Sequence, residues 1–149
     1  MHSKVNEIKI SYLLKRNINL APRIGFSGDA ADILFEFWDT KTIALQESFY
    51  IILLNNSNRI KGIYRHSKGG ITGTLVDIRI ILAVALKSLS TGIILAHNHP
   101  SGKLEPSQAD KNLTDKIKQA CSYLDLAMLD HIILAPNGNY YSFADNGLL

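Results

Sequence analysis

Apolar positions along this chain follow two spacings, one typical of a helix with a single buried face and one typical of a buried strand. Ala31, Leu34, Phe35 and Trp38 recur at helical spacing, which predicts a helix over Ser27–Trp38 with Ser27 as a possible cap. Apolar runs and the turn signals between them predict six strands, over Glu7–Leu14, Thr42–Leu54, Arg59–Tyr64, Thr91–His97, Met128–Ala135 and Asn139–Phe143. Two further helices are predicted over Ile78–Leu89 and Ser107–Leu124. Because strands bracket helices on both sides, we expect an α/β layered fold around a mixed sheet.

Two histidines stand at the end of the predicted strand Thr91–His97. Residues i and i+2 of a strand point to the same side, so His97 and His99 project together. Asp110 lies in the first turn of the helix that opens at Ser107, where it can face back toward them. Two imidazoles and one carboxylate, with no thiol, are the donor set of a catalytic zinc site that keeps a fourth position open.

Each half of this pattern also has an ordinary structural interpretation. A His-x-His at a strand end is often structural, and Ser107-x-x-Asp110 is a common helix-capping signal. The combination favours metal binding, because a buried strand that ends in His-Asn-His needs partners for its imidazoles. Capping and metal ligation are compatible, since the cap fixes the turn that carries Asp110.

The string His97-Asn98-His99-Pro100-Ser101-Gly102, followed by Pro106-Ser107 and Asp110, resembles the signature of the JAB/MPN (JAMM) metalloprotease superfamily, and most closely its RadC branch. Matches outside the motif are Glu47-Ser48-Phe49, Arg79, Leu129–Ile133 and Tyr141–Phe143, so the resemblance covers about residues 40–147. It implies the cytidine-deaminase-like α/β/α arrangement of JAB domains. We expect a RadC-like JAB domain over residues 40–149, with residues 1–39 as an N-terminal extension packing on it in place of the helix-hairpin-helix region of full-length members.

The resemblance also implies a chemistry and assigns roles. One zinc ion per chain is expected on His97, His99 and Asp110. Glu47 is expected to act as the base that takes a proton from the attacking water, and Ser107 to donate to the oxyanion that forms on the scissile carbonyl. The expected reaction is hydrolysis of a peptide or isopeptide amide bond, with a protein or peptide as the substrate.

Three further residues near the motif carry open alternatives. Glu105 is a second candidate for the base, closer to the histidines in sequence but placed in a loop. Asp130 and His131 either orient a metal ligand from behind or form a satisfied polar pair on their strand.

Composition narrows the remaining classes. The 149 residues, 46% of them hydrophobic and 19% charged, fit one globular domain. Cys121 is the only cysteine, which excludes an intrachain disulfide and a thiolate metal cluster. No signal-peptide pattern and no apolar stretch of about 20 residues is present. We therefore expect a cytoplasmic protein without a membrane segment.

Rival functions find less support in the residues. The net charge of +3 comes from scattered basic residues, so no specific nucleic-acid partner is expected, although DNA repair is the traditional label of RadC proteins. A nucleic-acid deaminase needs His-x-Glu and Pro-Cys-x-x-Cys, whereas position 99 is His and only one Cys exists. HNH nucleases spread their motif over a longer ββα element. A non-catalytic interaction module stays as an alternative, and the sequence does not indicate the oligomeric state.

Overall fold

The computed structural model describes residues 4–149 apart from 8, 10–12, 14 and 71–74. Its elements are a short 3-10 helix (Ile18–Leu20), α1 (Ser27–Phe37), β1 (Ser48–Leu54), β2 (Ile60–Lys68), α2 (Ile78–Lys87), β3 (Gly92–Asn98), α3 (Gln108–Ser122), β4 (Ala127–Leu134) and β5 (Tyr140–Ser142). Among the described helices, none is long and apolar enough to cross a membrane.

The five strands form one mixed sheet in the order β2-β1-β3-β4-β5. β3 and β4 run parallel, and the other neighbouring pairs are antiparallel. The parallel pair needs a crossover connection, which α3 supplies. Every residue of β1 and β3 is buried, and most of them are apolar, which is typical of strands covered on both faces.

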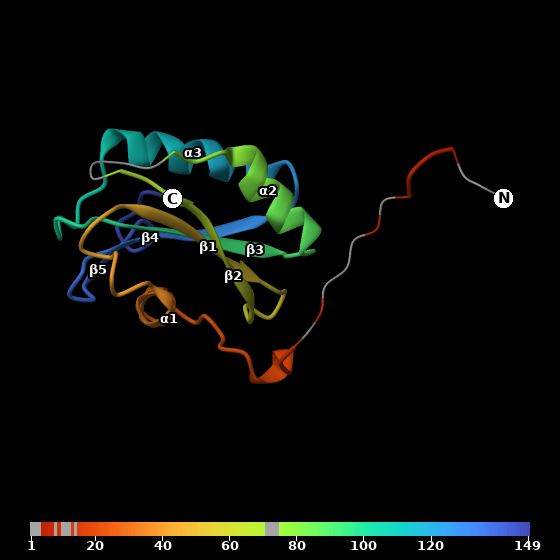
Figure 1. The fold of residues 1–149 in the computed structure, drawn as a ribbon, viewed down its shortest axis with the longest axis horizontal. Coiled ribbons are helices and arrows are strands. Elements are labelled where there is room, and N and C mark those ends of the chain that lie inside the picture. The colour runs from red at the N-terminus through yellow and green to blue at the C-terminus, as the bar shows by residue number, and fades with distance from the viewer. Residues whose placement is uncertain (1–3, 8, 10–12, 14, 71–74) are drawn as a thin grey trace.

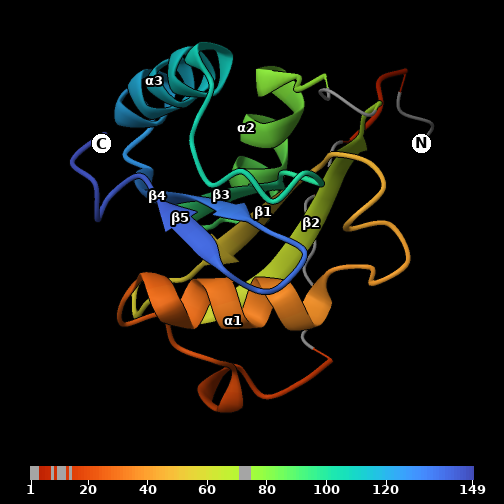
Figure 2. The same ribbon diagram turned by 90° about the vertical axis from the view of Figure 1, so that its left-hand side faces the viewer.

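Helices cover both faces of the sheet (Figures 1 and 2). α1 packs on one face, where Leu34 and Trp38 are buried and the Trp38 ring stacks on Tyr50 with centroids 3.9 Å apart. α2 and α3 lie on the other face, where Ile81 and Ile117 are fully buried against the strands. The expected α/β/α layering around a mixed sheet is confirmed.

The predicted strand Thr42–Leu54 is wrong in its first part. Asp39 to Gln46 instead form turns, in which the N–H groups of Ile43 and Gln46 donate to Asp39 and Thr42 carbonyls at 3.0 Å. Ile43 is buried in the core on the α1 face of the sheet, so its apolar character reflects this packing and not a place in a strand. The strand begins only at Ser48.

Two other predicted features differ from the structure. β2 extends to Lys68, beyond the predicted end at Tyr64, because pairing with β1 continues as far as Ser48. Ser27 is the first residue of α1 and not its cap. Its hydroxyl is hydrogen-bonded to the Asp145 carboxylate and the Tyr140 hydroxyl.

The N-terminal predictions are only partly open to comparison. The strand predicted over Glu7–Leu14 falls largely outside the described residues. The boundary between residues 1–39 and 40–149 stays a prediction, although α1, which lies before it, contributes Ala30, Ala31 and Leu34 to the core on its face of the sheet.

Candidate metal centre

Three potential metal ligands converge where β3 ends and α3 begins. The candidate ligand atoms of His97, His99 and Asp110 lie within 4.8 Å of one another. His97 Nε2 is 3.0 Å from His99 Nε2, and Asp110 Oδ2 is 3.4 Å from each of these nitrogens. His97 is buried, whereas His99 and Asp110 are half-buried, so the cluster is reached from solvent on one side.

The local sequence explains how each ligand is held. His97 and His99 share one face by strand alternation, and the His99 backbone N–H continues the pairing to the Leu134 carbonyl at 2.9 Å. Asp110 is fixed by a capping box: its N–H donates to Ser107 Oγ at 3.0 Å, while its Oδ2 accepts from the Ser107 N–H at 2.8 Å. The same carboxylate oxygen faces both imidazoles.

The donor set fits a metal cation. His99 Nδ1 lies 2.7 Å from the Lys103 carbonyl, which can only accept a hydrogen bond, so Nδ1 carries the ring hydrogen. In the neutral ring, Nε2 then carries a lone pair and no hydrogen. That lone pair faces the lone pairs of Asp110 Oδ2, and a cation removes the repulsion. Two imidazoles and one carboxylate suit zinc and also ferrous iron, so the residues show that a metal could bind but not which one.

The short distances between Asp110 and the two histidines shift the pKa values of Asp110 and His99. Although burial alone would raise it, the pKa of Asp110 is held well below its usual range by the imidazoles of His97 and His99, which donate to the carboxylate when they are protonated. Burial opposes protonation of His99, but hydrogen bonds to Asp110 and to the Lys103 carbonyl raise its pKa overall. The site therefore holds a charged carboxylate against two imidazoles, an arrangement that favours a cation between them.

Glu47 lies on the same face of the sheet as the two histidines. Phe49 pairs with His97 in the β1–β3 register, and continuing this register by two residues brings Glu47 level with His99. Burial raises the pKa of the Glu47 carboxyl, and the charges of His97, His99 and Asp110 act on it as well. The structure thus brings Glu47 together with the three candidate ligands, which lie about fifty residues or more further along the sequence.

Glu105, the alternative base, is placed differently. Its carboxylate lies 3.5 Å from Lys103 Nζ in the loop before α3, and 73% of its side chain is exposed. Glu105 therefore takes part in an ordinary surface ion pair with Lys103.

The sequence interpretation missed the role of Asn98, which is fully buried between the two histidines. Its side chain points to the α1 side of the sheet and makes three hydrogen bonds: the amide donates to the carbonyls of Ile43 (2.7 Å) and Gln46 (3.0 Å), and the oxygen accepts from the Ser48 N–H (2.7 Å). These partners flank Glu47 on both sides. Asn98 therefore ties the segment that carries Glu47 to the strand end that carries the histidines.

The neighbours Asp130 and His131 point to opposite faces of β4. His131 is fully buried and lies 2.7 Å from His97 through Nε2 and Nδ1, and burial keeps its pKa well below the usual value. Asp130 accepts from the Ser142 hydroxyl (2.6 Å) and the Ala144 N–H (3.0 Å), which fastens β5 to β4. Of the two, only His131 contacts a candidate ligand among the described hydrogen bonds.

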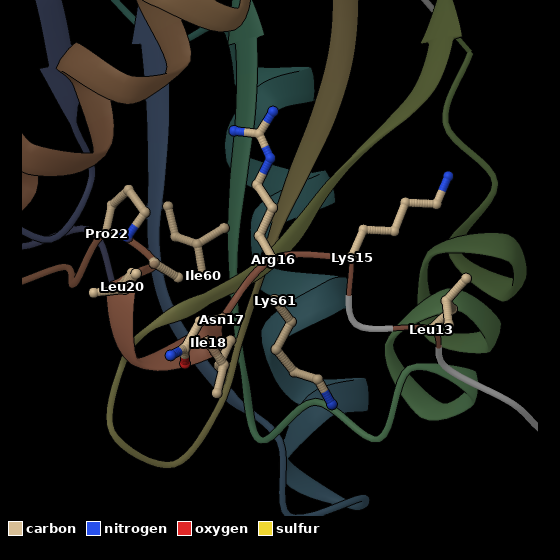
Figure 3. A pocket seen from close by; sticks show the side chains of 10 residues that line it. Leu13, Lys15, Arg16, Asn17, Ile18, Leu20, Pro22, Ile60 and Lys61 are labelled. Atoms are coloured by element: carbon tan, nitrogen blue, oxygen red, sulfur yellow. The ribbon is translucent and has the colours of Figure 1, made fainter.

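A cavity of about 640 Å³ lies at the other end of β2, away from this cluster. Figure 3 shows Ile60 and Lys61 beside residues of the N-terminal segment, such as Leu13 and Arg16. Its described lining includes no histidine, cysteine or acidic side chain.

Comparisons with known proteins agree with the geometry. A family model described as the RadC-like JAB domain matches residues 26–148. The chain is 51% identical to a UPF0758 protein of Flavobacterium johnsoniae over 102 residues, which cover 68% of this chain and 44% of that protein. It is 34% identical over 148 residues to a UPF0758 protein of Chlorobaculum parvum, covering 99% of this chain and 66% of that protein. The chain thus spans about half to two thirds of the length of these relatives.

Proposed function

This chain belongs to the RadC-like JAB domain family, and from this membership and the geometry of its site we propose that it is a zinc-dependent hydrolase of peptide or isopeptide amide bonds. The observation that carries the proposal is the convergence of two imidazole nitrogens and one carboxylate oxygen beside a partly buried glutamate. Some members of the wider JAB superfamily are metalloproteases, which makes amide hydrolysis the reaction class to test first.

His97 and His99 would hold the ion through Nε2 and Asp110 through Oδ2. When bound in such a site, zinc supplies Lewis acidity, which lowers the pKa of water and polarises a carbonyl. The Asp110 carboxylate stays charged without metal, and the capping box keeps Oδ2 aimed at the histidines. The ligand arrangement is thus largely preformed by β3 and α3.

Glu47 is proposed to move the proton. A general base works best when its pKa lies near the working pH, and burial raises the pKa of Glu47 in that direction. Its carboxylate would take a proton from the attacking water and return it to the leaving amine. Asn98, which anchors the backbone on both sides of Glu47, would keep this carboxylate level with the histidines.

Ser107 is proposed to stabilise the oxyanion. Its oxygen accepts the Asp110 N–H with a lone pair, so its own hydroxyl hydrogen remains available for donation. Ser107 is exposed to solvent, so a substrate carbonyl can reach it. Capping the helix and donating to an oxyanion therefore use different parts of one hydroxyl group.

The proposed substrate is a protein or peptide, the proposed location is the cytoplasm, and no nucleic acid is proposed as a specific partner. The single cysteine is buried, which suits a reducing compartment. The basic residues are scattered along the sequence, which disfavours a continuous phosphate-binding surface.

The test combines metal analysis with hydrolysis. Elemental analysis of protein purified without chelator should find one zinc per chain, with iron measured alongside. The zinc-loaded protein is then incubated with a library of synthetic peptides that includes isopeptide-linked lysines, and cleavage is read by mass spectrometry. Glu47→Gln should retain zinc and lose about 100- to 10,000-fold in rate, because it removes the base and no ligand.

Glu105→Gln is the matched control, since it removes an exposed acid from the neighbouring loop and should leave the rate unchanged. A Glu47→Gln variant that loses zinc would make Glu47 a ligand. If it cleaves peptides at the parent rate, the proposed base is wrong. Protein that takes up no zinc on titration would refute the proposed function as a whole.

A further inference from the structure

A chain of buried hydrogen bonds runs away from the metal side of His97. His97 Nδ1 lies 2.7 Å from His131 Nε2, and His131 Nδ1 lies 2.6 Å from Thr114 Oγ1. The Thr114 hydroxyl in turn donates to the carbonyl of Asp110 at 2.7 Å. The chain starts on one candidate ligand in β3, crosses β4 and α3, and ends on the backbone of another candidate ligand.

The direction of every hydrogen in this chain follows from its last member. The hydroxyl of Thr114 has one hydrogen, and the Asp110 carbonyl takes it because a carbonyl can only accept. Thr114 Oγ1 must then accept from His131 Nδ1–H. The Nε2 of the neutral His131 ring is left as an acceptor, which requires the hydrogen of His97 to sit on Nδ1.

The consequence falls on the other nitrogen of His97. A neutral imidazole carries one hydrogen, so His97 with a hydrogen on Nδ1 presents a lone pair on Nε2. Nε2 is the atom that faces His99 and Asp110. The buried chain thus selects the one neutral form of His97 that can bind a cation at the cluster.

We propose that Thr114 and His131 are positioning residues that set the tautomer of His97 and thereby prepare it to bind metal. The proposal rests on the metal site of the proposed function, but it concerns the protein before metal arrives. Thr114 and His131 are 0% exposed, and the His131 ring stacks on Phe143 with centroids 4.7 Å apart. Solvent therefore does not supply a replacement partner, and the packing holds the ring in place.

Removing the hydroxyl of Thr114 should release this constraint. In Thr114→Val the shape is kept, but His131 Nδ1–H loses its acceptor. The ring can then carry its hydrogen on Nε2 and donate to His97 Nδ1, which moves the hydrogen of His97 to Nε2 and blocks the ligand atom. Thr114→Ser keeps the hydroxyl and is the matched rescue variant.

The first measurement needs neither metal nor substrate. Nitrogen NMR of isotopically labelled histidine side chains in metal-free protein at neutral pH reports which ring nitrogen carries the hydrogen. We expect Nδ1–H for His97 and His131 in the parent and in Thr114→Ser, and a population with Nε2–H on His97 in Thr114→Val. A parent protein with Nε2–H on His97, or with a doubly protonated His131, would overturn the proposal even if every variant failed to fold.

The second measurement is zinc affinity, obtained by competition with a chromophoric chelator. Loss of a residue that orients a metal-bound histidine typically weakens metal binding about 10- to 100-fold. We expect this loss for Thr114→Val and for His131→Phe, and near-parental affinity for Thr114→Ser. Equal zinc affinity and equal tautomers in all variants would reduce Thr114 and His131 to a buried structural pair. Predicted tautomers in a protein that cleaves no peptide would instead refute the proposed function and leave this inference standing.

Discussion

Ser107 offers a sharp test of the proposed chemistry, because its two proposed roles differ in energy and in readout. In Ser107→Ala the helix loses the hydrogen bond from the Asp110 N–H to Oγ, whose length is 3.0 Å. The backbone N–H of residue 107 remains, so the Asp110 carboxylate keeps its 2.8 Å hydrogen bond and its aim at the histidines. Zinc affinity should therefore stay close to that of the parent.

The stability cost of Ser107→Ala is set by the cap alone. Loss of a serine N-cap costs about 0.5–2 kcal/mol, and the lower half applies here because the freed N–H is exposed and can bond to water. A loss of 1 kcal/mol lowers the Tm of a chain of this size by about 2–4 °C. Native domains typically have a free energy of unfolding of about 5–15 kcal/mol, so the variant should stay folded. Loss of the cap alone should therefore not slow turnover.

The catalytic cost is larger if Ser107 donates to the oxyanion. Removing one such donor typically slows turnover about 100- to 1000-fold. Ser107→Asp is the second variant: aspartate also caps a helix, but it places negative charge where negative charge develops. Thermal unfolding, zinc content and peptide cleavage are measured on both variants. Ser107→Asp should be folded, zinc-loaded and inactive, and parental turnover by this variant would reduce Ser107 to a cap.

Three further outcomes are expected. Asn98→Ala leaves two backbone carbonyls and one N–H without their partner, which at about 1–3 kcal/mol each should cost roughly 3–9 kcal/mol in urea unfolding. The exposed Asn112→Ala should cause little change, and a loss below about 1 kcal/mol for Asn98→Ala would contradict the anchoring role. Burial raises the pKa of the Cys121 thiol to about 11, so the thiolate form is scarce at pH 8 and native protein should react with a thiol reagent far more slowly than unfolded protein. DNA binding should be no tighter than the generic range of about 10⁻⁴–10⁻⁶ M at physiological salt, and strand cleavage that is abolished by His99→Ala would overturn this expectation.

The sequence by itself determined those features that depend on short stretches of chain. His97, His99 and Asp110 lie within one strand end and the first turn of the next helix, so strand alternation and a capping signal were enough to predict their convergence. Likewise, the apolar run before His97 was enough to predict that β3 is a buried strand. Glu47 was found only through the resemblance, because no local pattern distinguishes it from a solvated acid at a strand end.

Tertiary structure decided everything that depends on a partner distant in sequence. Ile43 packs in the core on the α1 face of the sheet although it lies in a turn, and its neighbours in sequence do not indicate this, so the predicted strand began too early. The same holds for Asn98, whose partners lie about fifty residues upstream, and for Thr114, which meets His131 only because β4 lies parallel to β3 with α3 above them. The type of a polar side chain determines which hydrogen bonds it can donate or accept, but only the packed fold determines which buried group becomes its partner. The motif therefore revealed the candidate ligands, whereas the fold revealed the residues that hold them in position.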